Sequence, residues 1–216
     1  MEPIILASGS PLRQNFFRLL NLPFSCIPAE IDETPPPGLS PRQTAENLAL
    51  RKVMAVVEKN EKLGVSNVKW IFGADTIVVL NGEIFGKPAD RADAQSMLER
   101  LSGHRHEVIT AMALYKGAED SRRQRTDCRS VVSEAAIAPL SGAEIAWYLD
   151  SGEWEGAAGS YRLQGLGACL ITAVNGSPSG VAGLPLYEFY AMLRDNGYPV
   201  WGRGTDGSSV PALRYS

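Results

Sequence analysis

A short apolar strand that ends in an Asn-Gly turn sets the first limit on the fold. Residues 77–80 read Ile-Val-Val-Leu, Asn81 and Gly82 follow, and residues 83–85 (Glu-Ile-Phe) have the composition of a returning strand. Asn-Gly between two such runs is the strongest short-range signal for a two-residue β-hairpin. The chain is therefore predicted to contain at least one antiparallel pair of strands.

Helical segments with recognisable N-caps separate the other strand-like runs. The capping signals lie at Ser10, Ser40, Asp90 and Ser141, and the helix after Ser40 is predicted to extend to about Lys62. Further strand-like runs lie at 4–7, 70–72, 106–116, 126–138 and 168–174, and a last helix begins near 185. Helical crossovers join parallel strands and hairpins join antiparallel ones, so we expect an α/β fold with a mixed, twisted sheet flanked by helices.

Length and charge narrow the class of protein. For 216 residues we expect one domain over 1–198, followed by a flexible Gly/Ser-rich tail over 199–216. A net charge of −3 disfavours a protein that mainly coats nucleic acid, and no stable nucleic-acid partner is expected. Three widely spaced cysteines, no apolar run of membrane-spanning length and no secretory signal favour a cytoplasmic protein without a membrane partner.

Residues 8–11 (Ser-Gly-Ser-Pro) lead from the first strand into a helix N-terminus. Free backbone N–H groups and the helix dipole favour an anion at such a place. Arg13, in the first helical turn, adds a positively charged fork. The pattern predicts an anion site that includes Ser8 and Arg13; an ordinary capped helix with a solvated arginine is the alternative.

Lys52 interrupts an apolar stripe. Positions 45, 48, 49, 55 and 56 share its helix face and are Ala, Leu, Ala, Ala and Val. The commoner explanation for such a lysine is a side chain that snorkels at the edge of the stripe. The other explanation is a lysine aimed into a cleft, where a bound anion compensates its charge.

Asp75 and Lys87 lie near the open end of the predicted hairpin. Counting back from the tight turn places Thr76 opposite Lys87, with Asp75 next in line. Strict alternation puts Asp75 and Lys87 on opposite faces, so a bulge or twist near Gly86 is needed to bring them together. A weak surface ion pair is the alternative. No turn requires an aspartate here, and this favours a functional role.

Asp32 and Glu33 form a carboxylate pair that can hold a hard divalent cation, although a solvated acidic turn is the usual meaning of such a pair. Residues 82–88 are similar to a Walker A loop but are one residue short and carry proline in place of the metal-binding Ser/Thr. No GxGxxG follows a strand. His104 and His106 are two residues apart, which fits a loop or strand-edge role better than a metal site.

A series of short blocks occurs in a fixed order between about Ile4 and Leu193. They are residues 6–11 with Arg13, 31–34, 73–76, 86–88, 101–103, 106–108 with Thr110, 158–159 with Tyr161, 164–167 and 183–186. Together they resemble the Maf family of nucleotide pyrophosphatases. Several blocks in the same order are far more specific than any single one.

The resemblance implies an ITPase/Maf-like fold with a deep cleft between two lobes, often as a homodimer. It implies hydrolysis of a nucleoside triphosphate to the monophosphate and pyrophosphate with a divalent cation, Mg²⁺ or Mn²⁺, by a hydrolase that acts on acid anhydrides. The implied roles are phosphate binding by Ser8, Arg13, Lys52 and Lys87, metal binding by Glu33 and Asp75, and general-base catalysis by Asp75.

Three positions carry base specificity in the family, and here they are Leu12, Thr76 and Gln164. Thr76 and Gln164 match the branch that prefers dTTP and UTP over 7-methyl-GTP. Leu12 stands where that branch commonly has arginine, and Ala157 stands where a lysine is usual. Arg162, in place of the usual glycine, is a candidate for the missing cation.

Two other functions are compatible with a phosphate pocket. The first is a nucleotide- or nucleic-acid-binding regulator of cell division without enzymatic activity, which would gain nothing from the carboxylates of Glu33 and Asp75. The second is a phosphatase that releases single phosphates. Identification of the products separates all three.

Overall fold

The computed structural model describes residues 1–65, 68–117 and 124–200. Seven strands in these ranges form one mixed sheet in the order β2-β1-β3-β5-β6-β7, with β4 paired to β3 beside this path. The strands are β1 (Ile4–Leu6), β2 (Phe24–Cys26), β3 (Trp70–Leu80), β4 (Glu83–Phe85), β5 (Arg105–Lys116), β6 (Arg125–Ile137) and β7 (Ile171–Asn175). The helices are α1 (Pro11–Leu19), α2 (Pro41–Lys62), α3 (Arg91–Leu101), α4 (Gly142–Asp150), α5 (Pro178–Val181) and α6 (Leu186–Asp195).

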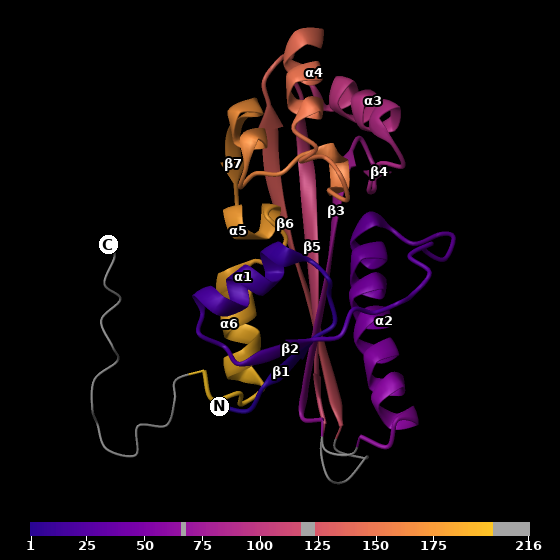
Figure 1. Ribbon diagram of the computed structural model, residues 1–216, viewed down its shortest axis with the longest axis vertical. Helices are drawn as coiled ribbons and strands as arrows, with labels where there is room; N and C mark the ends of the chain where they lie inside the picture. The colour runs from indigo at the N-terminus through magenta and orange to yellow at the C-terminus, as the bar shows by residue number, and fades with distance from the viewer. Residues whose placement is uncertain (66–67, 118–123, 201–216) are drawn as a thin grey trace, which may run out of the picture.

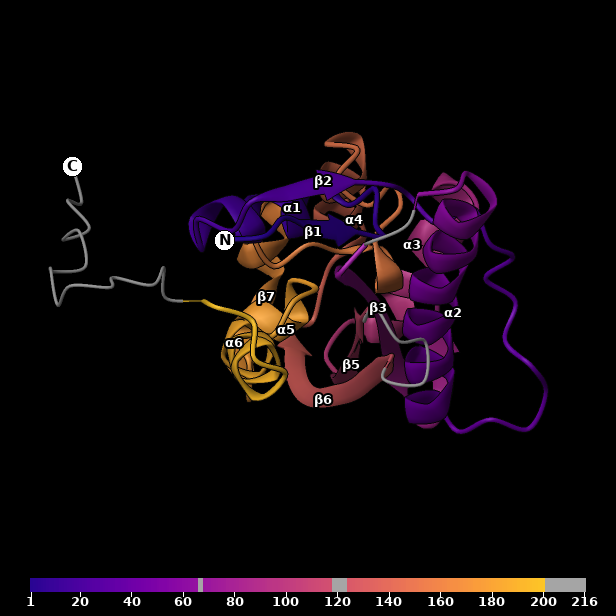
Figure 2. The same cartoon turned by 90° about the horizontal axis from the view of Figure 1, so that it is seen from below.

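The helices flank the long strands β3, β5 and β6 on both sides. In Figure 1, α2 runs along one side of these strands and α1 and α6 lie on the other, while α3 and α4 pack together at the upper end. Figure 2 shows α2 and α6 on opposite sides of β5. Separate apolar clusters fill the space under α2, under α1 and α6, and between α3 and α4. The predicted α/β fold with a mixed sheet flanked by helices is confirmed.

Local signals in the sequence set most helix starts. The side chains of Ser10, Ser40, Asp90 and Ser141 each accept a hydrogen bond from the backbone N–H three residues on. These bonds satisfy amides that have no partner inside a helix. The hairpin turn is also as predicted: Asn81 and Gly82 have φ of 52° and 83°, the left-handed values that a tight two-residue turn demands.

Some elements differ from the prediction. β2 and α5 were not predicted, because three or four residues carry no clear periodicity. The strand expected at 168–174 begins only at Ile171, since residues 166–170 form a 3-10 helix. Of the tail predicted over 199–216, residues 201–216 lie outside the described residues, and Val200 packs on the cluster under α1 and α6. No helix in the described ranges has the length and apolarity that crossing a membrane requires.

One edge of β3 is shared by two short strands that leave a gap between them. β1 pairs in parallel with Ile71 and Phe72, and β4 pairs antiparallel with Val78 to Leu80. The other edge of β3 is occupied by β5 along almost its whole length. Among the described residues, the stretch 73–77 therefore has no strand partner on the β1/β4 side. The chain turns away from the sheet at both borders of this gap, and this leaves room for a cavity.

The pairing of Thr76 with Lys87 expected from the hairpin was wrong. β4 ends at Phe85, so the ladder between β3 and β4 stops before it reaches Thr76. Thr76 is instead opposite Thr110 of β5. Lys87 lies beyond the end of β4, where the backbone no longer follows the sheet and its side chain is free of strand alternation.

Candidate active site

A cavity of about 330 Å³ opens at the gap beside β3. All the residues to which the family resemblance gives a phosphate-binding, metal-binding, catalytic or specificity role line it: Ser8, Leu12, Arg13, Glu33, Lys52, Asp75, Thr76, Lys87 and Gln164. Its lining residues divide into two sets by their chemistry. We call Arg13, Glu33, Lys52, Asp75 and Lys87, with the hydroxyl of Ser8, the charged half, and Leu12, Val78, Val108, Ala157, Ala158, Tyr161 and Gln164 the uncharged half. Thr76 also lines the cavity, and its Oγ1 lies 3.1 Å from Arg13 Nη2.

Arg13 is held at three points by different elements. Its Nη1 donates to Ser8 Oγ (3.2 Å), its Nη2 to Thr76 Oγ1 (3.1 Å) and its Nε to the carbonyl oxygen of Gly183 (2.9 Å). Burial lowers the pKa of Arg13, and the charges of Asp75 and Glu33 oppose that shift. The guanidinium is a fixed positive group beside the N-terminus of α1 and not a solvated surface arginine.

Lys52 points into the cavity and not along the edge of its helix. The residue is 7% exposed, and its Nζ donates to Asp75 Oδ1 at 2.6 Å, with Glu33 Oε1 at 2.8 Å. A close approach of α2 to β3 makes this contact possible. A Cβ on Gly73 would lie 2.8 Å from Val53 Cγ2 and 3.2 Å from the backbone oxygen of Ala49, so only glycine fits.

Glu33 joins the second lysine to this pair. Its Oε2 accepts from Lys87 Nζ at 2.7 Å, so the order of contacts is Lys87, Glu33, Lys52, Asp75. Burial raises the pKa of Glu33, but the hydrogen bonds from both lysines outweigh it and lower the pKa to about 2. Asp75 and Lys87 are thus linked through Glu33 and Lys52, and the structure contains no direct pairing at a bulge near Gly86.

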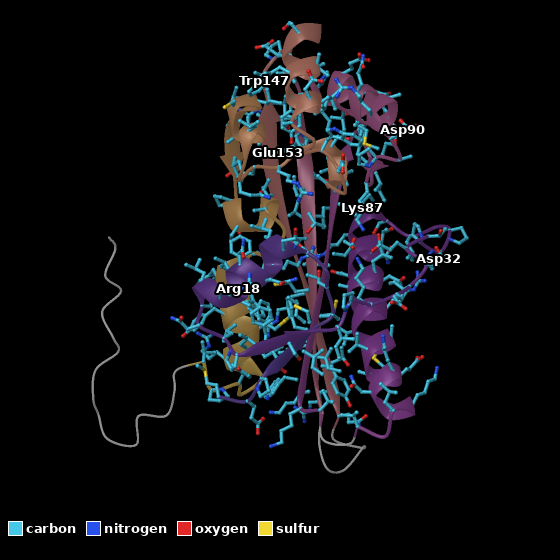
Figure 3. The ribbon with its side chains drawn as sticks, in the orientation of Figure 1. Arg18, Asp32, Lys87, Asp90, Trp147 and Glu153 are labelled. Carbon is cyan, nitrogen blue, oxygen red and sulfur yellow. The ribbon has the colours of Figure 1, made fainter. Side chains whose placement is uncertain are left out.

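Asp32, the other half of the predicted carboxylate pair, does not line the cavity. Its Oδ1 accepts the backbone N–H of Thr34 at 2.9 Å, and this hydrogen bond lowers the pKa of Asp32. Figure 3 shows Asp32 on the loop outside α2, farther from the sheet than Lys87. Asp32 therefore shapes the acidic turn, while Glu33 alone points into the site.

The donor set fits a divalent cation that is shared with a ligand. Glu33 and Asp75 both bind the same lysine nitrogen, so their carboxylates converge at one place in the cavity. No group of three or more His, Cys, Asp or Glu side chains able to hold a metal occurs among the described residues. Mg²⁺ is commonly held by one or two carboxylates together with phosphate oxygens and water, and two carboxylates meet that need.

Buried contacts support the uncharged half from behind. Tyr161 is 6% exposed, and its hydroxyl lies 2.7 Å from Nε2 of His106, which is 3% exposed. Burial lowers the pKa of His106 to about 4, so the imidazole is neutral at pH 7. His106 is thus a buried residue that fixes a cavity-lining tyrosine, and not the strand-edge residue expected from its spacing to His104.

Arg162 lines the cavity but its guanidinium is engaged elsewhere. Its Nε donates to the backbone oxygen of Glu153 (2.7 Å) and its Nη2 to that of Glu155 (2.6 Å). In return, the carboxylate of Glu153 accepts the backbone N–H groups of Leu166 (2.9 Å) and Gly167 (3.3 Å). Figure 3 places Glu153 beside the upper part of the sheet. Arg162 therefore holds the loop that carries Gln164, and the idea that it replaces a missing cation loses support.

Two supporting groups were not predicted from the sequence. The carbonyl oxygen of Gly183 binds Arg13, and a backbone oxygen leaves no trace in a residue pattern. The carboxylate of Glu153 organises the loop after Gln164, and an exposed glutamate gives no sign of such a task. Thr110, which lies opposite Thr76, is different: its sequence position did carry a signal, because it is a hydroxyl in an otherwise apolar stretch of β5.

Comparison with known proteins adds a family. The model of the family described as Maf-like protein matches residues 3–196. A dTTP/UTP pyrophosphatase of Symbiobacterium thermophilum is 42% identical over 209 residues, which cover 94% of this chain and 99% of that protein. A dTTP/UTP pyrophosphatase of Geobacter metallireducens is 41% identical over 194 residues, or 90% of this chain and 96% of that protein.

Likeness to solved structures is weaker. The Ham1 protein of Staphylococcus aureus has 18% sequence identity, covering 64% of this chain and 73% of that chain, with a TM-score of 0.43. That score is too low to support a conclusion about fold or function.

Proposed function

Because the chain belongs to the Maf family, we propose that it is a nucleoside triphosphate pyrophosphatase that prefers dTTP and UTP, with Asp75 as the general base. The activity class rests on relatives that match nearly the whole chain. The observation that carries the mechanism is the buried contact between Lys52 and Asp75 inside a cavity lined by Arg13 and Lys87.

The charged half supplies the groups that bind the triphosphate. Arg13 and Ser8 at the N-terminus of α1 grip phosphate oxygens, and Lys52 and Lys87 exchange Glu33 for phosphate when the substrate enters, while Lys52 keeps its contact with Asp75. These cations also stabilise the negative charge that moves onto the leaving pyrophosphate. A divalent cation held by Glu33 and Asp75, Mg²⁺ or Mn²⁺, would neutralise further phosphate charge.

Asp75 takes the proton of the attacking water. The water oxygen forms the new P–O bond, the bond between the α- and β-phosphates breaks, and pyrophosphate leaves with the bonding electron pair. Lys52, 2.6 Å from Asp75 Oδ1, orients the carboxylate for this step. The uncharged half, which includes Gln164, holds the base together with Thr76. A homodimer and a cytoplasmic location stay predictions.

A nucleotide panel with product identification tests this function. With Mg²⁺ or Mn²⁺, dTTP and UTP should yield the monophosphate and pyrophosphate at higher kcat/KM than 7-methyl-GTP. The Asp75→Asn variant should lose about 10²- to 10⁴-fold in kcat, the usual contribution of a general base. The matched control is Asp150→Asn, which should keep full activity, because this exposed carboxylate pairs with Arg91 and with no other charged group in the described part of the chain.

Each other outcome contradicts the proposal in a distinct way. Binding of triphosphate without turnover favours a nucleotide-binding regulator. Release of orthophosphate indicates a phosphatase. Preference for 7-methyl-GTP overturns the interpretation of Thr76 and Gln164, and full activity of Asp75→Asn removes the proposed base.

A further inference from the structure

Thr110 is a buried hydroxyl behind the site. It is 1% exposed, does not line the cavity and lies opposite Thr76 in the ladder between β3 and β5. Its Oγ1 lies 2.8 Å from the carbonyl oxygen of Gly180 and 2.9 Å from Thr76 Oγ1. Thr76 Oγ1 is in turn 3.1 Å from Arg13 Nη2. A line of hydrogen bonds thus crosses four elements, α1, β3, β5 and α5.

Donor and acceptor chemistry fixes the direction of every bond in this line. The carbonyl oxygen of Gly180 can only accept, so the single hydroxyl proton of Thr110 points to it. Thr110 Oγ1 must then accept the proton of Thr76. The guanidinium of Arg13 can only donate, so Nη2 of Arg13 donates to a lone pair of Thr76 Oγ1. No other arrangement satisfies all three contacts.

We propose that Thr110 is a positioning residue that holds the Arg13 guanidinium through Thr76. By taking the proton of Thr76, Thr110 turns that hydroxyl into a pure acceptor aimed at Arg13. The Nε of the same guanidinium donates to Gly183, and Gly180 accepts from Thr110, so both ends of the line are fixed on α5 and the turn that follows it. The fork of Arg13 is thereby oriented before an anion arrives.

A purely structural role for Thr110 makes a different prediction. If the hydroxyl served only to satisfy Gly180, its removal would lower stability and leave anion binding by the folded protein unchanged. If it acts through Thr76, its removal lets the Thr76 proton turn toward Arg13 and weakens the grip on phosphate. Valine is the appropriate replacement, because it keeps the branched shape of threonine and lacks the hydroxyl.

The test measures inorganic pyrophosphate binding by calorimetry and kcat/KM for dTTP. Thr110→Val should weaken pyrophosphate binding about three- to tenfold and lower kcat/KM by about tenfold, the range for loss of one hydrogen bond. Thr110→Ser, which keeps the hydroxyl, should restore both. In a Thr76→Val background, Thr110→Val should add less than a twofold change, because the two residues act as one unit.

Thr172→Val is the matched control. Thr172 Oγ1 also donates to a backbone oxygen, that of Ala136 at 3.2 Å, but it lies on β7 outside the cavity, so both readouts should stay at wild-type values. Equal effects of Thr110→Val in both backgrounds, or no effect on pyrophosphate binding by folded protein, overturn the proposal.

The turnover arm rests on the proposed function, and the binding arm does not. If the wild-type protein bound pyrophosphate but released none from dTTP, the proposed function would fail while the positioning role of Thr110 is still decided by the binding data.

Discussion

The two halves of the cavity are built in opposite ways. In the charged half, side chains hold one another: Lys87 binds Glu33, Glu33 binds Lys52 and Lys52 binds Asp75. In the uncharged half, segments of backbone pack closely against the sheet. Gly159 has φ of 66° and approaches Val78 so closely that a Cβ would lie 2.9 Å from its Cγ2. Mutually paired charges thus characterise one half, and close backbone packing supported by buried and reciprocal contacts characterises the other.

The difference separates chemistry from selection. Charges fixed by mutual pairing, with Asp75 on a buried strand and Lys52 on a long helix, suit a reaction on phosphate, which every nucleotide shares. Loops shaped by glycine and by reciprocal contacts, such as that between Arg162 and the turn at Glu153, suit a surface that reads the variable part of a substrate. Changes in the charged half should therefore affect all nucleotides, and changes in the uncharged half should affect their ratios.

The largest expected effect comes from the center of the charged half. Lys52→Met removes the partner of two carboxylates and leaves Asp75, 7% exposed, without its counter-charge. Loss of one partner of a buried ion pair costs about 3–5 kcal/mol. We expect kcat/KM to fall about 10²- to 10³-fold for every triphosphate, with a lower unfolding midpoint, as measured by steady-state kinetics and urea denaturation.

Lys87→Met is the matched variant. The side chain of Lys87 is 54% exposed and contacts only Glu33 in the network, so we expect a loss of about tenfold and an unchanged unfolding midpoint. Equal losses of kcat/KM in the two variants would show that the greater burial of Lys52 does not make it more important for activity than Lys87. If Lys52→Met changed the ratio of kcat/KM for UTP to kcat/KM for other nucleotides, the proposed division of roles between the two halves would be wrong.

The second effect concerns the backbone of the uncharged half. A Cβ on Gly167 would lie 2.3 Å from the backbone oxygen of Arg162, a contact that no side-chain rotation relieves. We expect Gly167→Ala to lower the free energy of unfolding by about 2 kcal/mol, as measured by urea denaturation. Gly142→Ala is the control, because a Cβ at the start of α4 meets nothing within 4 Å. Equal stability of both variants would show that the loop yields freely.

The same contrast explains what could be predicted from the sequence. Lys52 and Asp75 were recognisable because each is a charge in an apolar pattern, and the structure brings both to the cavity. Their mutual contact was not predictable. It depends on α2 packing against β3, which brings together two residues 23 apart in the sequence, and on Gly73 allowing α2 to approach.

Local signals were sufficient for most elements of the fold and insufficient for their pairing. Caps at Ser10, Ser40 and Ser141 gave helix starts because capping is a contact within four residues. The gap beside β3 results from two short strands that come from distant parts of the chain, and no local pattern encodes it.

The third effect is a pH dependence that distinguishes the halves. His106, beneath Tyr161, has its pKa lowered by burial from 6.5 to about 4. Between pH 6.5 and about pH 4, His106 is therefore mostly protonated in the unfolded chain and mostly neutral in the folded protein. The free energy of unfolding falls as the pH falls through this range. The pKa of Glu33 is lowered from 4.5 to about 2, so this carboxylate makes stability depend on pH only below about pH 4.5. Between pH 7 and 5.5 the loss comes from the uncharged half.

Urea denaturation at pH 7 and 5.5 measures this loss. The wild-type protein should lose about 1 kcal/mol through His106, and His106→Asn should lack that component. His104→Asn should keep it, because His106 is still present. The same slope in His106→Asn and wild type would show that another group titrates in this range.

The smallest expected effect concerns Gln164, and it is the most specific. Its side chain is exposed, lines the cavity and makes no hydrogen bond with any described residue, so its amide is available to a ligand. An amide both donates and accepts, which matches the adjacent N–H and C=O groups of uracil and thymine.

Gln164→Met keeps the length of the side chain and removes both functions. The ratio of kcat/KM for UTP to that for CTP should fall about three- to tenfold, while pyrophosphate binding stays unchanged. Gln95→Met, on the exposed face of α3, should alter neither quantity. If Gln164→Met instead lowered kcat/KM equally for all nucleotides and weakened pyrophosphate binding, Gln164 would belong to the charged half, and base selection would lie with Leu12 and Thr76.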